Sequence, residues 1–245
     1  MLEVPIGVAA DKRPVALSLQ HALVVGATGS GKSELLRAFV LRLAERYPPD
    51  EAVVLLVDHH GGATFRTFAR LPHLAGLAVE MWAPGDVPRL ATVLRDELIR
   101  RQTVGPKPEL VVVIDEFTEV LTSDPEFVHT LIAIGRVGRS LGVHLVMAGQ
   151  RFDAGRLRGL DTYLANRIVL RMFTAAESRL VLGTDDAFAL PFEAGLGFLV
   201  RGAEAPVRFK AEYVPDLDAR LGALVAGRVR ERPLLYTSTN GGLNE

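Results

Sequence analysis

The sequence contains no cysteine among its 245 residues. This absence excludes disulfides, thiolate-ligated metal sites and thiol nucleophiles. An excess of one charge is missing as well, because 28 Lys and Arg residues are balanced by 29 Asp and Glu residues. A net charge of −1 gives no general electrostatic attraction for nucleic acid, although a local basic surface can still exist within that total.

Long apolar runs are also missing. No stretch approaches the roughly 18 uncharged apolar residues that a membrane-spanning helix needs, and residues 1–13 lack the apolar core of a secretory signal. We therefore expect a soluble chain, and its abrupt start indicates a piece of a longer protein. Hydrophobic residues still make up 49% of the sequence, which is enough for a large core.

What the sequence does have is the pattern G-x-x-x-x-G-K-S at residues 26–33. Glycines let backbone N–H groups turn toward phosphates, and a helix that begins at the end of such a loop adds a favourable dipole. Lys32 is expected to reach the β- and γ-phosphates, and Ser33 to place its hydroxyl on Mg²⁺. The predicted nucleotide-binding residues are Gly26, Ala27, Thr28, Gly29, Ser30, Gly31, Lys32, Ser33 and Glu34.

The segments on either side of this loop support the prediction. Residues 21–25 form a short apolar run that predicts a buried strand. Residues 33–46 predict a helix, because one side of it carries apolar residues at helical spacing: Leu35, Leu36, Phe39, Val40 and Leu43. Strand, glycine loop and helix follow one another as phosphate binding requires, so an accidental match is the weaker alternative.

A second motif lies at the end of another apolar run, residues 109–114, which is followed by Asp115 and Glu116. In P-loop enzymes an acidic residue at the end of a neighbouring parallel strand holds Mg²⁺, often through water, and Asp115 fits that role. Glu116 is placed to polarise the attacking water as a general base. Acid pairs at strand ends are common, but one that follows a phosphate loop predicts ATP binding and hydrolysis.

The remaining patterns predict an α/β fold with a mostly parallel sheet and helices on both faces. We expect a β-rich start over residues 1–20, and a single domain over residues 1–236 with a flexible polar tail at 237–245. A helix over residues 89–102 is predicted to turn its charges outward. The other expected elements are a strand at 52–58, a helix at about 125–141, strands at 143–148 and 168–172, and a hairpin of 197–201 with 207–213 at the sheet edge.

Several longer strings resemble the FtsK/SpoIIIE-type P-loop ATPases, and most closely the ATPase modules of the EccC motor proteins of type VII secretion. These strings cover residues 4–213 and include HALVVGATGSGKSELLR, VVVIDEFTEVL and IGRVGRSLGVHLVMAGQR. The string GRLRGLDTYLANRI resembles the first of three tandem modules more than the later ones. The resemblance implies a RecA-like core with ATP as the nucleotide, bound between neighbouring subunits of a hexameric ring.

Such a ring needs an arginine from the adjacent subunit to stabilise charge on the transferring phosphate. Arg139 and Arg89 are the two candidates, and for each the alternative is a solvated surface arginine. Gln150 follows the predicted strand at 143–148 and matches a polar residue that senses the γ-phosphate or its water. An amide that caps the strand end is the alternative for Gln150.

Two departures from the family pattern stand out. Residues 58–62 are D-H-H-G-G where the family has D-F-K-G-G, which removes a lysine and leaves the role of that loop open. His59 and His60 have no third ligand in the sequence pattern and are predicted to be loop residues rather than a metal site. The segment from Arg101 to Glu109 is shorter than in relatives, and we expect this difference to affect only an outer surface.

The resemblance implies a motor module that moves secreted protein substrates toward a membrane pore. It would act on the cytoplasmic side of a membrane-anchored parent protein, beside further ATPase modules and membrane components, and would be slow in isolation. Two other hypotheses stay open. A DNA-translocating motor shares this fold, although the balanced charge does not favour nucleic acid, and a regulatory ring element would bind nucleotide with little hydrolysis of its own.

Overall fold

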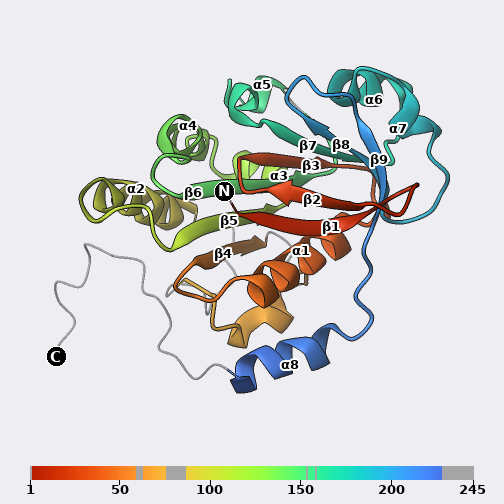
Figure 1. Cartoon of the computed structure of the whole chain (residues 1–245). Coiled ribbons are helices and arrows are strands. Elements are labelled where there is room, and N and C mark those ends of the chain that lie inside the picture. The colour runs from red at the N-terminus through yellow and green to blue at the C-terminus, as the bar shows by residue number, and fades with distance from the viewer. Residues whose placement is uncertain (1, 59–62, 76–86, 153, 158, 228–245) are drawn as a thin grey trace.

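The computed structural model describes residues 2–58, 63–75, 87–152, 154–157 and 159–227. One nine-stranded sheet runs through this part of the chain in the order β2-β1-β9-β8-β7-β3-β6-β5-β4 (Figure 1). The strands are β1 Glu3–Ala9, β2 Pro14–Ser18, β3 Ala22–Val25, β4 Ala52–Asp58, β5 Glu109–Asp115, β6 Val143–Gly149, β7 Asn166–Leu170, β8 Leu196–Arg201 and β9 Val207–Ala211. The predicted tail at 237–245 and the pair His59–His60 lie outside the described residues.

Five neighbouring strands, β4, β5, β6, β3 and β7, are parallel, which confirms the predicted parallel sheet. Every residue of β3, β4 and β6 is buried. Continuous burial of this kind is typical of strands that are covered by helices on both faces. Because the five strands run the same way, their carboxyl ends lie along one edge of the sheet, and we call it the carboxyl edge. The opposite edge is the amino edge.

The other four strands are antiparallel and extend the sheet beyond β7. Strands β8 and β9 form the predicted hairpin, but the prediction that it lies at the sheet edge was wrong. Strand β1 pairs with the free side of β9, and β2, which pairs with β1, is the outermost strand of the sheet. This pairing joins the first residues of the chain to residues 209–211, a contact that a local sequence pattern does not reveal.

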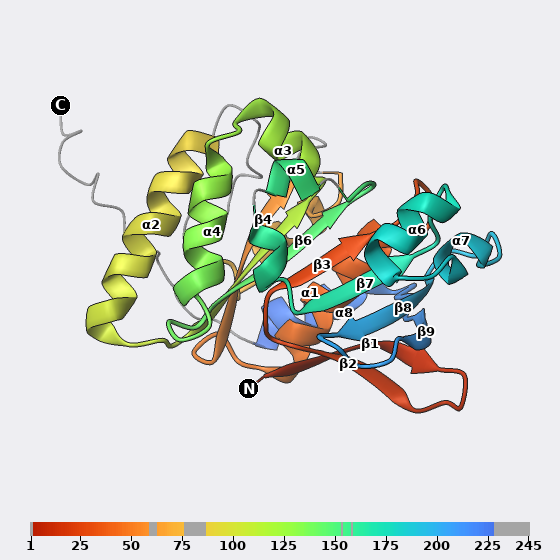
Figure 2. The same ribbon diagram turned by 90° about the horizontal axis from the view of Figure 1, so that it is seen from above.

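Helices cover both faces of the sheet (Figure 2). One apolar core cluster lies on each face. One cluster contains the buried side chains of α1, η1 and α8. The other contains those of α2 to α7 and η3. The helices are α1 Lys32–Arg46, η1 Arg66–Arg70, α2 Val87–Val104, α3 Phe117–Ser123, α4 Phe127–Val137, α5 Ala154–Leu157, η3 Leu160–Tyr163, α6 Ala175–Leu182, α7 Asp186–Ala189 and α8 Leu217–Gly227.

Two details of the helices differ from the sequence prediction. The helix predicted at 125–141 is the shorter α4, and α3 was not predicted at all. Strand β5 leads into α3 through a single residue, and a helix of 7 residues shows too little periodicity to stand out. None of the described helices has the length and apolar character needed to cross a bilayer.

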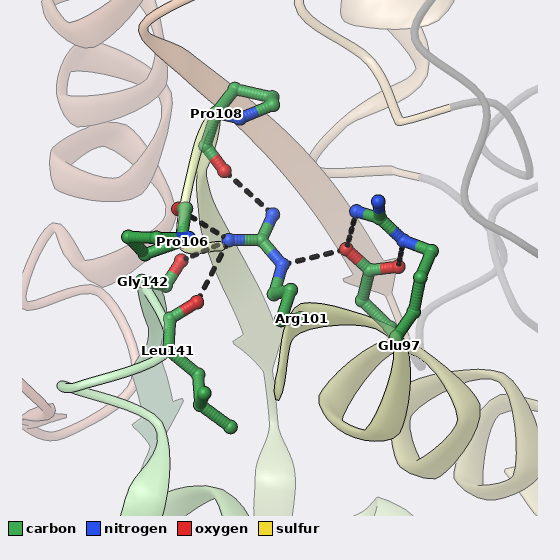
Figure 3. A network of polar contacts seen from close by, with 7 residues as sticks. Glu97, Arg101, Pro106, Pro108, Leu141 and Gly142 are labelled. Atoms are coloured by element: carbon green, nitrogen blue, oxygen red, sulfur yellow. Dashed lines mark hydrogen bonds and ion pairs between the residues drawn. The ribbon is translucent and has the colours of Figure 1, made fainter. Parts of the chain in front are cut away.

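Buried charges tie α2 to the amino edge of the sheet (Figure 3). The Arg101 and Glu97 side chains are each only 1% exposed, and Nε of Arg101 donates to the Glu97 carboxylate at 2.6 Å. Nη1 and Nη2 of Arg101 donate to backbone carbonyl oxygens before β5 and β6, those of Pro106, Pro108, Leu141 and Gly142.

This network corrects one prediction. Leu90, Val93, Leu94 and Leu98 of α2 are buried as expected, but the charges of α2 do not all turn outward, because Glu97 and Arg101 are inside. The short segment that follows α2 takes part in the network. Its carbonyl groups hold the Arg101 guanidinium and so fasten the helix to the sheet.

Candidate nucleotide-binding site

The phosphate loop follows β3 and leads directly into α1. Gly29 and Gly31 adopt positive φ angles of 77° and 98°, a region that favours glycine. At Gly31 an added Cβ would also lie 2.7 Å from the backbone nitrogen of Gly195. That nitrogen donates to the carbonyl oxygen of Ser30 at 2.7 Å. The turn before β8 therefore holds the loop in shape, and the glycine pattern follows from this close approach.

Lys32 opens α1, and its side chain folds back over the loop. Nζ donates to the carbonyl oxygens of Gly26 at 2.7 Å and Ala27 at 3.2 Å. Burial lowers the pKa of Lys32, while the nearby charges of Glu116 and Asp115 act in the opposite direction. The ammonium group thus lies inside the protein on two neutral acceptors, which the anionic oxygens of a phosphate can replace.

Asp115 and Glu116 lie buried at the carboxyl end of β5. Oδ2 of Asp115 accepts hydrogen bonds from Thr64 Oγ1 at 2.7 Å and Ser33 Oγ at 3.3 Å. Oδ1 accepts one from the backbone N–H of Glu116 at 3.1 Å. Glu116 itself has a φ of 53°, which is uncommon outside glycine and concentrates at functional turns.

Gln150 follows β6 and lies beside the phosphate loop, because Thr28 Oγ1 donates to its Oε1 at 2.8 Å. These residues line one cavity of about 520 Å³. Its walls hold most of the predicted binding and catalytic residues: Thr28, Gly29, Gly31, Lys32, Ser33, Glu34, Asp115, Glu116 and Gln150. The structure therefore brings together residues that are more than a hundred positions apart in the sequence.

A second, larger cavity of about 850 Å³ shares Glu116 and Gln150 with the first. Its other charged lining residues are Glu119, Arg151 and Glu177, so carboxylates are in excess. Glu119 is exposed on this wall. We call this space the acidic hollow. It is wide enough to admit side chains of another protein chain next to Glu116.

The two candidate arginines lie at opposite edges of the sheet. The last turns of α2 reach the amino edge through Arg101, and 18 residues of helix span about 27 Å, so Arg89 in the first turn lies toward the carboxyl edge. Arg139 is exposed at the amino edge, where its Nη1 donates to Gln20 Oε1 at 3.5 Å, just before β3. Neither arginine lines the nucleotide cavity of its own chain.

The donor set at the carboxyl edge suits Mg²⁺. Ser33 contributes a hydroxyl and Asp115 a carboxylate, and oxygen ligands of this kind are what Mg²⁺ prefers. Within the described ranges, no cluster of three or more His, Cys, Asp or Glu side chains is arranged to hold a metal ion. A magnesium ion here would therefore complete its coordination with water and nucleotide phosphates, as in other P-loop enzymes.

Sequence patterns did not identify Thr64 and Arg37 as part of this site. Thr64 lines the cavity, and Arg37 of α1 donates from Nε to the Thr64 carbonyl at 2.8 Å and from Nη2 to the Ala63 carbonyl at 2.7 Å. Arg37 is the last residue of the string HALVVGATGSGKSELLR, but no role was predicted for it or for Thr64. The structure places Thr64 after β4, whose last residue Asp58 pairs in register with Asp115.

Known proteins are similar to this chain in sequence and in fold. Residues 4–104 match the FtsK/SpoIIIE family. The ESX secretion system protein EccC of Thermomonospora curvata is 43% identical over 246 residues, which cover 87% of this chain and 19% of that protein. The ESX-4 secretion system protein EccC4 of Mycobacterium tuberculosis is also 43% identical, covering 87% of this chain and 20% of that protein.

A solved structure extends the similarity to the fold. The cytoplasmic domain of the Thermomonospora curvata type VII secretion ATPase EccC superimposes with a TM-score of 0.84 at 40% identity, over 91% of this chain and 31% of that one. The chain thus spans only about a fifth of the two EccC proteins, 19% and 20%. With its phosphate loop and the Asp115–Glu116 pair in place around one cavity, the chain belongs to the FtsK/SpoIIIE family of P-loop ATPases and is an ATPase module of the EccC type.

Proposed function

We propose that this chain hydrolyses ATP to ADP and phosphate, and that it does so as one subunit of a hexameric ring. The observation that carries this proposal is the single cavity lined by Lys32, Ser33, Asp115, Glu116 and Gln150. It combines a phosphate-binding loop, a metal-binding pair, a candidate base and a polar group for the attacking water. Positioning and electrostatics of this kind supply most of the acceleration in phosphoryl transfer.

Each side chain has a distinct task in this proposal. Backbone N–H groups of the loop from Gly26 to Glu34 hold the phosphates, and Lys32 exchanges its two carbonyl acceptors for phosphate oxygens. Ser33 and Asp115 would hold Mg²⁺, which neutralises charge on the β- and γ-phosphates. Glu116 takes the proton of the attacking water, and Gln150 orients that water or senses the γ-phosphate.

The arginine that stabilises charge on the transferring phosphate is, in this proposal, Arg89 of a neighbouring copy. Arg89 is exposed and lies toward the same edge of the sheet as the nucleotide cavity, whereas Arg139 lies at the amino edge. The acidic hollow beside Glu116 offers carboxylates that attract an incoming guanidinium. Arg139 stays as the alternative candidate, and one set of measurements compares the two.

The names of the relatives support a role in protein secretion. By analogy with the ESX and type VII secretion proteins, the ring would power the movement of secreted protein substrates. It would act at the cytoplasmic side of a membrane-anchored parent protein, together with further ATPase modules and membrane components. ATP rather than another nucleotide is likewise an inference from the family, since the base has no recognised contact.

A regulatory role with little hydrolysis is the second candidate. Arg37 is the one arginine among the described residues that line the nucleotide cavity, and it is held by Glu34 at 2.5 Å and by two carbonyl groups. None of the described residues that line this cavity is therefore a mobile arginine, and the isolated chain should turn over slowly until a ring forms. A DNA translocase is not favoured, because the net charge is −1.

Steady-state ATP hydrolysis against protein concentration tests the proposal. The rate per subunit should rise with concentration in the wild type and should be lost in Glu116→Gln and Arg89→Ala. Arg139→Ala is the matched control, an exposed arginine at the other edge, and should behave as wild type. A flat, near-zero rate despite tight ATP binding would favour the regulatory role, and loss of activity only in Arg139→Ala would transfer the assignment to Arg139.

A further inference from the structure

Thr64 makes the shortest side-chain hydrogen bond to Asp115. Its hydroxyl donates to Asp115 Oδ2 at 2.7 Å, and the Thr64 residue is 5% exposed. Ser33 donates to the same oxygen at the longer distance of 3.3 Å. If Ser33 bound a metal ion through its hydroxyl oxygen, the Thr64 hydroxyl would remain the closer of the two side-chain donors to this carboxylate oxygen.

The backbone around Thr64 is fixed from two directions. Oδ2 of Asp58, the last residue of β4, accepts from the backbone N–H groups of Thr64 at 2.7 Å and Phe65 at 3.3 Å. From the other side, Arg37 of α1 donates to the carbonyl oxygens of Ala63 and Thr64. The position of Thr64 therefore depends on β4 and on the helix that also carries Lys32 and Ser33.

We propose that Thr64 is a positioning residue that orients the Asp115 carboxylate for Mg²⁺. The proposal rests on the proposed function, because it assigns a task at the same nucleotide site. Asp58 and Asp115 are register partners on adjacent strands. Thr64 bridges them with two hydrogen bonds, which its backbone N–H donates to Asp58 and its hydroxyl donates to Asp115. Partners behind a metal ligand fix its orientation, and their loss commonly weakens metal affinity about 10- to 100-fold.

The test compares Thr64→Val, which removes the hydroxyl at constant shape, with Thr64→Ser, which keeps it. The measured quantity is the affinity for a fluorescent, slowly hydrolysed ATP analogue, first in EDTA and then along a Mg²⁺ titration. Thr64→Val should raise the Mg²⁺ concentration at the midpoint by about tenfold, and should leave the EDTA affinity unchanged. Thr64→Ser should stay within about twofold of the wild type, because the hydroxyl is restored.

A merely structural role predicts a different result. It would weaken nucleotide binding equally with and without Mg²⁺, or would lower the urea midpoint in both variants, and either outcome overturns the proposal. If Thr64→Val does not fold, Thr64→Ala carries the same test, since it removes the hydroxyl without placing a methyl group against Asp115.

Failure of the two proposals can be told apart. A wild-type chain that binds nucleotide in a Mg²⁺-dependent way but never hydrolyses it overturns the proposed function and leaves the role of Thr64 intact. An unchanged Mg²⁺ midpoint in Thr64→Val with an active wild type overturns the role of Thr64 alone. A nucleotide affinity that ignores Mg²⁺ in the wild type overturns both.

Discussion

Buried charges lie at both edges of the parallel sheet, but they are held in different ways. At the amino edge, Arg101 is 1% exposed and donates to one carboxylate and four carbonyl oxygens of the same chain. At the carboxyl edge, Lys32, Asp115 and Glu116 line a cavity. The Lys32 ammonium there donates to two carbonyl groups of its own loop, at 2.7 and 3.2 Å.

This difference separates a structural use of buried charge from a chemical one. A buried ion pair whose partners all belong to the fold is costly to break, and it fastens elements together. Buried charges that face a cavity keep partners that a ligand can replace, and such groups mark candidate functional sites. The comparison predicts that changes at the carboxyl edge alter chemistry, whereas changes at the amino edge alter stability.

The largest effect is expected at Glu116. Replacing it by Gln should lower ATP turnover by about 10²- to 10⁴-fold, because the amide cannot accept the proton of the attacking water. Nucleotide affinity and the urea midpoint should stay close to those of the wild type. Single-turnover hydrolysis and equilibrium binding measure the two quantities, and a turnover within threefold of the wild type would remove Glu116 from the role of base.

Arg101→Leu should have the largest effect on stability. Losing the guanidinium takes an ion-pair partner from the buried Glu97 carboxylate and a donor from four carbonyl groups, so the free energy of unfolding should fall by about 3–5 kcal/mol. Arg100→Gln is the matched control: Arg100 also pairs with Glu97 but is 29% exposed, and it should cost at most about 1 kcal/mol. Urea denaturation gives both values, and equal effects would contradict the comparison.

A smaller effect, dependent on pH, is expected at His21. Burial lowers its pKa from 6.5 to about 4, with the charges of His144 and Arg139 acting in the same direction. The unfolded chain therefore binds more protons between about pH 6.5 and about pH 4, so stability falls as the pH falls through that window, by about 3 kcal/mol over the whole of it.

His21→Asn provides the control for this pH dependence. Nδ1 of His21 accepts from the backbone N–H of Leu145 at 3.1 Å, and an amide oxygen can take over that role without titrating. Unfolding free energies measured from about pH 7 to about pH 5 should decline in the wild type and stay flatter in the variant. Parallel curves would show that His21 does not cause the decline.

Local sequence patterns were enough to predict the centre of the site. The phosphate loop and the acid pair each lie within a few consecutive residues, so the loop at 26–33 and the strand that ends at Asp115 could be identified without a structure. The position of Gln150 near the loop could be predicted as well, because parallel strands bring their carboxyl ends to one edge of the sheet.

Contacts between distant segments could not be predicted in this way. The place of the β8–β9 hairpin depends on the first strand of the chain, and Thr64 joins the site through a hydrogen bond across 51 positions. The burial of Arg101 was not predicted, for a related reason. A charged residue on a helix is normally solvated, and the burial of Arg101 becomes favourable through the Glu97 carboxylate together with the carbonyl groups of two other segments.

The most direct test of the central claim is hydrolysis by a mixture of two inactive variants. Glu116→Gln subunits keep Arg89, and Arg89→Ala subunits keep Glu116, so a site shared between subunits is complete at some interfaces of a mixed ring. A site shared between subunits predicts that mixing equal amounts restores part of the wild-type rate at the same total concentration. A rate equal to the sum of the two separate variants, under conditions where the wild type is active, would contradict it.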